Sequence, residues 1–295
     1  MTAPSGIVIV DKPGGMTSHD VVARVRRLAG TRKVGHAGTL DPMATGVLVV
    51  GVEKATRLLG HLMLTEKEYA ATIRLGQTTS TDDAEGEITG TATAEGVSIE
   101  AIDKAVASLT GEILQVPPVV SAIKVGGQRA YKLTRAGAAP ELKSRPVTVS
   151  EFTVTGIRRV EEAGEMAGLL DLDATVRCSS GTYIRALARD LGEVLGTGGH
   201  LTALRRTRVG GYRVEDARTL DQLAERFEVL PLAPAAAAAF PRRDLTEDEA
   251  RRLAHGGRLA PAGTEGPTAA FGPDGTLIAL VTEESGQTRP LAVFA

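Results

Sequence analysis

An acidic residue stands inside a string of small and turn-forming residues near the N-terminus. The string is Gly35-His36-Ala37-Gly38-Thr39-Leu40-Asp41-Pro42-Met43-Ala44-Thr45-Gly46. Pro42 biases Asp41 towards an extended backbone, and the glycines leave room for a ligand to approach the chain. A loop carboxylate of this kind can act as a nucleophile or a base. Local pattern alone also allows an N-cap, because Asp followed by Pro begins many helices.

A carboxylate shielded from water stays ionised when a positive charge lies beside it. The segment Ser180-Gly181-Thr182-Tyr183-Ile184-Arg185 offers a guanidinium at the start of a predicted helix over residues 182–195. Residues in the first turn of a helix can face a cleft, so Tyr183 and Arg185 are candidate site residues. The alternatives are a packing aromatic for Tyr183 and a surface cation for Arg185.

Aromatic residues that could stack on a base are scarce, with four Tyr, five Phe and no Trp. Tyr69 opens a predicted strand over residues 69–75 and follows the charged residues Glu66-Lys67-Glu68. It is a candidate for stacking, and an edge packing residue is the alternative.

Charge is segregated along the chain although the net charge is only −2. Residues 22–33 hold five cations and no acid, residues 124–145 hold six cations and one acid, and residues 201–213 hold four cations and no acid. Residues 77–112 hold eight acids and one lysine. Segregated charge creates local potentials that the total conceals. The three basic segments predict a phosphate-binding face, with separate solvated faces as the alternative.

Composition excludes several classes of protein. The chain has 295 residues, enough for one large domain and a small one. Cys178 is the single cysteine, which excludes an internal disulfide and a cysteine-based zinc site. No apolar run approaches the roughly 18 residues of a membrane span, and the N-terminus lacks the pattern of a signal peptide. We expect a cytoplasmic protein that does not enter a membrane.

Two acidic segments resemble sites of other classes. Residues 169–175 (Leu-Leu-Asp-Leu-Asp-Ala-Thr) resemble a phosphatase signature, but their acids alternate with apolar residues as in a half-buried strand. Residues 81–87 resemble a calcium loop but lack the terminal glutamate of an EF-hand, so we expect a solvated polar loop.

The pattern of predicted elements favours an α+β protein with a mixed, largely antiparallel sheet, because strands and helices do not alternate regularly. Residues 231–241 contain prolines around a run of alanines and are predicted to be a linker. A β-rich domain over residues 242–295 follows. The predicted strands cover residues 6–10, 46–52, 69–75, 146–159 and 168–178, and the predicted helices cover residues 17–28, 98–109, 182–195 and 216–227.

Eight short motifs follow one another along the chain. They are residues 11–18 (DKPGGMTS), 35–46, 67–69 (KEY), 116–118 (VPP), 121–124 (SAIK), 178–185 (CSSGTYIR), 198–201 (GGHL) and 204–206 (LRR). By these motifs and their order, which is specific as a set, nearly the whole chain resembles the TruB family of tRNA pseudouridine synthases.

The resemblance implies isomerisation of one uridine, at position 55 in the T arm of tRNA. The base is detached from ribose, turned over and rejoined through carbon, after the uridine has been flipped out of its loop. Whether the carboxylate attacks the sugar or the base, or assists through a glycal route, stays open. By the same resemblance, Asp41 would be the catalytic aspartate, Arg185 would pair with it, and Lys12 would brace the active-site loop. Tyr69 would stack on the flipped uracil, and Tyr183 and Leu204 would line the uridine pocket. His36 would fill the space that the base leaves in the RNA.

The resemblance also implies the pseudouridine synthase fold with a small C-terminal PUA-like β-barrel. It places a catalytic domain at residues 1–230, with a basic RNA-gripping insertion near residues 117–145, before the linker and the C-terminal domain. We expect tRNA as the partner, a monomer, and neither a metal nor an organic cofactor. The alternative function is a noncatalytic tRNA-binding protein or tRNA-folding chaperone on the same scaffold. The complete set of candidate site residues argues against it, because binding alone needs no buried acid.

Overall fold

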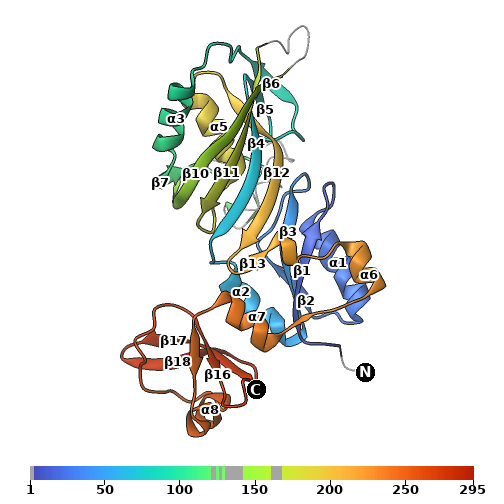
Figure 1. The fold of residues 1–295 in the computed structure, drawn as a ribbon, viewed down its shortest axis with the longest axis vertical. Helices are drawn as coiled ribbons and strands as arrows, with labels where there is room; N and C mark the ends of the chain where they lie inside the picture. Colours follow the sequence, from blue (N-terminus) through green and yellow to red (C-terminus); the bar gives the residue numbers. More distant parts are fainter. Residues whose placement is uncertain (1–2, 121–123, 126–127, 130–141, 161–167) are drawn as a thin grey trace. The chain divides into compact units, whose positions relative to one another are not determined.

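The computed structural model describes residues 3–120, 124–125, 128–129, 142–160 and 168–295. Residues 1–65 and 208–295 form one compact unit, and residues 66–207 form a second (Figure 1). With one exception, the described strand pairs of defined register are antiparallel. This confirms the predicted α+β class and its largely antiparallel sheet. The basic insertion predicted near residues 117–145 lies mostly outside the described residues.

Short apolar strands form the centre of the first unit. Strands β1 (Gly6–Lys12) and β3 (Thr45–Val52) pair antiparallel, from Gly6 opposite Val52 to Lys12 opposite Gly46. Strand β2 (Val34–Ala37) also pairs with β3, and β14 (Leu230–Pro231) pairs with β1. Most of β3 is buried, which explains why its sequence is a continuous apolar run rather than an alternating one.

Helix α1 (Ser18–Ala29) begins and ends on residues that suit those positions. The Thr17 hydroxyl accepts the N–H of Asp20, and the Asp20 carboxylate accepts the N–H of Thr17, which together form a capping box. Gly30 ends the helix in the left-handed region at φ 64°. One core cluster joins α1 and helix α6 (Leu220–Glu225) to the strands through Val8, Val10, Val21, Val22, Val25, Leu48, Val50 and Leu223.

The segment predicted to be a linker contains helix α7 (Leu232–Ala239). Ala235 and Ala236 are fully buried in a cluster shared with the helical turns η1 (Glu53–Leu58) and α2 (Leu59–Leu62). Strand β13 (Tyr212–Arg213) directly precedes the turn η3 (Val214–Asp216). The hydroxyl of Tyr212 donates to the Ala235 carbonyl at 2.9 Å. Alanine side chains permit this close packing, so residues 232–239 are a packed helix rather than a free connection.

The C-terminal residues form a small sheet in the order β15 (Arg242–Asp244), β16 (Thr268–Phe271), β17 (Leu277–Glu284) and β18 (Gln287–Val293). Strands β15 and β16 are the parallel pair, and helix α8 (Glu247–Ala254) packs on the sheet through Leu253. The β-rich region is confirmed, but its described strands make an open path with no pair between β15 and β18. The described strands therefore form a small sheet, and no closed barrel is detected among them.

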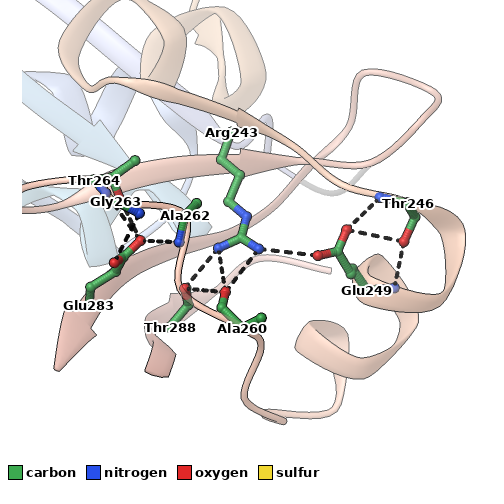
Figure 2. Close-up of polar contacts among 9 residues, drawn as sticks. All are labelled: Arg243, Thr246, Glu249, Ala260, Ala262, Gly263, Thr264, Glu283 and Thr288. Atoms are coloured by element: carbon green, nitrogen blue, oxygen red, sulfur yellow. Dashed lines mark hydrogen bonds and ion pairs between the residues drawn. The ribbon is translucent and has the colours of Figure 1, made fainter. Parts of the chain in front are cut away.

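Two charged side chains hold the loop at residues 260–264 beside this sheet (Figure 2). Arg243 donates to the Ala260 carbonyl at 3.2 Å and pairs with Glu249 at 3.1 Å. The Glu283 carboxylate accepts the backbone N–H groups of residues 262–264. These hydrogen bonds lower the pKa of Glu283, because they favour its charged form.

The second unit is built on five strands in the order β12 (Gly199–Val209), β4 (Lys67–Leu75), β11 (Leu170–Cys178), β10 (Arg145–Arg159) and β7 (Gly111–Gln115). Strand β4 alternates between buried and more exposed residues, as predicted for a sheet with two different faces. The smaller pairs are β5 (Gln77–Thr79) with β6 (Ile88–Thr91) and β8 (Lys124–Val125) with β9 (Gln128–Arg129).

Helices α3 (Ile99–Ser108) and α5 (Ile184–Val194) contact β10 and β4, respectively. Asp171 in β11 accepts both guanidinium N–H groups of Arg74 at 2.8 and 3.0 Å. The phosphatase-like segment is thus a strand, as its alternation predicts, and its Asp171 is buried in a cross-strand ion pair rather than facing water. Within the described ranges, no helix combines the length and apolar character needed to cross a membrane.

We expect Gly211→Ala to destabilise the protein by about 3 kcal/mol. A Cβ at Gly211 overlaps the backbone carbonyl of Ala238 in α7, where neither segment has a flexible side chain to move aside. The free energy of unfolding is measured by urea denaturation of the full chain. Gly60→Ala in α2 is the matched control, because nothing lies within 4 Å of its added Cβ. Equal stabilities for the two variants would contradict the packing of α7 against residue 211.

Candidate active site

Asp41 lies in the loop between β2 and β3, and its side chain is half-buried. Strand β3 begins at Thr45 and no helix follows Asp41, so the N-cap alternative is excluded. The Ser18 hydroxyl fixes the loop by accepting the Leu40 N–H at 2.9 Å and contacting the Leu40 carbonyl at 3.2 Å. The carboxylate therefore stands on a short loop that is tied to the first turn of α1.

Lys12 braces the same loop from the end of β1. Its side chain is fully buried. Its ammonium group donates to the carbonyls of Pro13, Met16 and Pro42 at 2.9, 2.6 and 3.1 Å. Since Pro42 directly follows Asp41, these bonds fix the backbone next to the candidate catalytic carboxylate.

His36 lies on β2, five residues before Asp41. Its ring packs edge-on against the ring of His19 in α1, with 5.6 Å between centroids and an interplanar angle of 86°. In the first unit, Lys12 thus lies on β1, His36 lies on β2, and Asp41 lies on the loop that joins β2 to β3.

Tyr69 and Leu204 lie in the second unit, on β4 and β12, and both are buried. Lys67 is two residues from Tyr69, on the same face of β4, and is 5% exposed. Burial and the nearby cation Arg206 lower the pKa of Lys67 to about 8. Arg206 itself is 1% exposed, so two cations are buried beside the strand that carries Tyr69.

Arg185 is buried in the first turn of α5 and forms an ion pair with Asp83 at 3.4 Å. The guanidinium also donates to the carbonyls of Thr81 at 2.7 Å and Val120 at 2.9 Å. Asp83 is held in turn, since it accepts the N–H of Glu85 and the hydroxyl of Thr81. A buried cation needs such a partner, because an isolated charge in the interior is costly.

Tyr183 occupies the position before α5, and its backbone contacts the side chain of Gln115. The second unit therefore holds Tyr69, Tyr183, Arg185 and Leu204. The predicted pairing of Arg185 with Asp41 joins residues of different units and stays a prediction.

Asp83 and Gln115 are two buried polar residues beside the candidate site residues that sequence reasoning missed. The loop at residues 81–87 is not fully solvated as predicted, because Asp83 is 2% exposed. The sequence held one signal for these ion pairs: Asp82 and Asp83 are adjacent acids, and Arg185 and Arg189 lie one helical turn apart. In the structure Asp82 pairs with Arg189 and Asp83 pairs with Arg185. Among the described residues, no group of three His, Cys, Asp or Glu side chains is arranged to hold a metal ion.

A family model described as TruB family pseudouridylate synthase (N terminal domain) matches residues 26–184, more than half of the sequence. The chain belongs to the TruB family. Two further models match later parts of the chain: tRNA pseudouridylate synthase B C-terminal domain over residues 185–230, and tRNA Pseudouridine synthase II, C terminal, over residues 240–295.

Curated relatives in the TruB family are similar over almost their full length. The tRNA pseudouridine synthase B of Thermobifida fusca (strain YX) is 65% identical over 290 residues, which cover 98% of each chain. The protein of the same name from Streptomyces griseus subsp. griseus is 62% identical over 296 residues, covering 100% of this chain and 98% of the relative.

A solved structure shares the TruB-family fold. A chain of an H/ACA RNP bound to a substrate RNA containing 2'-deoxyuridine is 26% identical and has a TM-score of 0.68. The likeness covers 98% of this chain and 83% of the other. The predicted pseudouridine synthase fold is therefore confirmed.

The depressed pKa of Lys67 predicts a pH-dependent stability. Between pH 8 and the usual lysine pKa of 10.5, the unfolded chain binds a proton at Lys67 that the folded chain does not. Stability therefore rises with pH in that range. Raising the pH from 8 to 10 should stabilise the wild type by about 2 kcal/mol relative to Lys67→Met.

Urea denaturation at each pH measures this difference. Lys104→Met, at an exposed lysine of α3, is the matched control and should show no comparable change relative to wild type. A wild-type gain no larger than that of Lys67→Met would contradict the buried environment assigned to the Lys67 amine.

Proposed function

We propose that this TruB-family chain converts uridine to pseudouridine in tRNA, at position 55 of the T arm. Two relatives named tRNA pseudouridine synthase B support the tRNA substrate, with 65% and 62% identity over nearly whole chains. The observation that carries the proposal is the half-buried Asp41 on a loop braced by Lys12 and Ser18. A fixed acid of this kind is required for chemistry and not for binding.

The reaction is an isomerisation in which no atom is gained or lost. The bond between N1 of uracil and C1' of ribose breaks, and a bond between C5 and C1' forms. C5 loses its proton and N1 carries one in the product. In the proposal, the Asp41 carboxylate acts on the nucleoside during this exchange, and the Arg185 guanidinium keeps that carboxylate ionised.

The uridine must leave its loop before the bond at C1' can be reached, at a cost of a few kcal/mol. In the proposal, Tyr69 stacks on the extruded uracil, and Tyr183 and Leu204 line its pocket. Their burial supports these roles for Tyr69 and Leu204, because an apolar pocket favours a base removed from water. The His36 ring takes the space that the base leaves in the RNA.

The tRNA backbone contacts the basic segments of the chain in this proposal. The exposed cations of α1 and the residues after it include Arg24, Arg27, Arg32 and Lys33. The chain acts as a monomer in the cytoplasm, since one asymmetric RNA gives no reason for paired subunits. The chemistry involves neither redox nor hydrolysis, so the proposal includes no metal and no organic cofactor.

Asp41→Asn should reduce pseudouridine formation at least about a thousandfold while tRNA affinity stays within about threefold. The amide keeps the shape of the side chain but cannot act as a nucleophile or base. Release of tritium from tRNA labelled at C5 of uridine measures turnover, and filter binding measures affinity.

Asp221→Asn, an exposed carboxylate in the first turn of α6, is the matched control and should retain full turnover. Turnover of Asp41→Asn near that of the wild type would remove Asp41 from the mechanism. A wild type that binds tRNA without releasing tritium would instead favour the noncatalytic tRNA-binding function.

Arg27→Glu should weaken tRNA binding and reduce the slope of log Kd against log salt by about 1, because a phosphate contact is lost. Binding is measured over a series of salt concentrations. Arg159→Glu is the control, since Arg159 is an exposed cation already paired with Glu95 at 3.2 Å. An unchanged slope for Arg27→Glu would remove α1 from the RNA-binding face.

A further inference from the structure

Helix α5 begins differently from three other helices of the chain. Helices α1, α6 and α8 each have threonine at the N-cap, and an Asp, Gln or Glu side chain at N3 accepts the N–H of that threonine. The N-cap of α5 is Tyr183, and the residue at N3 is Ala186. Neither side chain can complete a capping box, so the backbone N–H of Tyr183 needs an acceptor from elsewhere.

Gln115 supplies that acceptor from β7, 68 residues away in the sequence. Its side-chain oxygen accepts the N–H of Tyr183 at 2.8 Å, and its side-chain N–H₂ donates to the Tyr183 carbonyl at 3.1 Å. Gln115 is 2% exposed. A buried amide that pairs with both backbone groups of one residue fixes the plane and the position of that residue.

Two arginines of α5 strengthen the same junction. Arg189 donates to the Val116 carbonyl at 2.8 Å, and Arg185 donates to the Val120 carbonyl at 2.9 Å. Residues 115–120 are thus tied at three points to Tyr183 and the first half of α5. The contact of Gln115 is the one that acts on Tyr183 itself.

We propose that Gln115 is a positioning residue that fixes the backbone of Tyr183 and thereby aims the Tyr183 ring at the uridine. The inference rests on the proposed function, in which Tyr183 lines the uridine pocket. Tyrosine is not a favoured N-cap residue. The amide oxygen of Gln115 does for the Tyr183 N–H what the N3 side chain does for the N-cap residue in α1, α6 and α8, while the Tyr183 side chain makes no capping hydrogen bond.

Gln115→Met is the direct test, because methionine has a similar length and makes neither hydrogen bond. We expect kcat to fall about 10- to 100-fold, since a small displacement of a positioned group has effects of this size. The Kd for tRNA should stay within about threefold, because phosphate contacts dominate it. Gln222→Met is the matched control: it removes a glutamine that accepts an N-cap N–H in α6, and it should leave kcat unchanged.

A spectroscopic readout separates positioning from a general loss of structure. Incorporation of 3-fluorotyrosine labels the four tyrosines, and Tyr183→Phe assigns the fluorine signal of Tyr183. Gln115→Met should shift or broaden that signal and leave the signal of the buried Tyr212 in place. If the fluorine signal of Tyr212 also moves in Gln115→Met, this variant is unfolded. The inference is then tested with Gln115→Glu.

Gln115→Glu keeps an acceptor for the Tyr183 N–H but loses the donor while the introduced carboxyl is ionised. Protonation restores a donor, so its kcat relative to wild type should rise as the pH is lowered from 8 to 6. A flat ratio would overturn the inference. The inference would also be overturned if Gln115→Met left both the fluorine signal of Tyr183 and the kcat unchanged. A wild type inactive on tRNA would refute the proposed function, whereas a displaced Tyr183 signal would still support the contact.

Discussion

The second unit depends on one buried ion pair between Arg185 and Asp83. With side chains 5% and 3% exposed, neither charge has water to stabilise it. Removing one partner of such a pair costs about 3–5 kcal/mol, because the other charge stays buried. Asp83 is also fixed by its neighbours, as Thr79 donates to its carbonyl and Thr81 to its carboxylate. The loop after β5 and the first turn of α5 are therefore locked together, and the guanidinium has a set position before any substrate arrives.

The first unit fixes its charged groups by a different means. Lys12 donates to the backbone carbonyls of Pro13, Met16 and Pro42. Each carbonyl oxygen accepts a charge-assisted hydrogen bond, which offsets part of the cost of burying the ammonium group. Ser18 adds the contacts to Leu40, on the other side of Asp41. The first unit thus organises its candidate residues through hydrogen bonds to backbone groups, whereas the second unit also uses a pair of side chains, Arg185 and Asp83.

The sequence predicted the elements whose signals are local. Apolar runs predicted β1 and β3, alternation predicted β4, and the helix predicted over residues 17–28 corresponds to α1. Strand β12 had no comparable signal, because Arg205, Arg206 and Arg208 interrupt its apolar residues; Arg206 is nevertheless buried. Helix α7 was not predicted, because the packing of small alanines is a tertiary contact that prolines at both ends do not reveal.

The site was predictable only to the extent that its motifs are contiguous. Asp41 and Arg185 stand in recognisable strings, whereas the partners that fix Arg185 and Tyr183 are 102 and 68 residues away. No local periodicity reports such pairs. Gln115 and Asp83 are also chemically ordinary in sequence, and their importance follows from burial, which only the fold determines.

Departures from local rules gather on the motif segments of the second unit. Tyr183 stands at an N-cap where Thr, Ser, Asp or Asn is preferred. Lys67 is buried with a pKa near 8, so the folded state carries an electrostatic cost at neutral pH. Both residues belong to strings that carry the family resemblance, and both are replaceable by residues that would suit a stable fold better. Selection for stability alone does not favour either choice. Local conflicts of this kind are expected where residues serve a reaction, and Tyr183 is a residue to which the proposed function gives such a role.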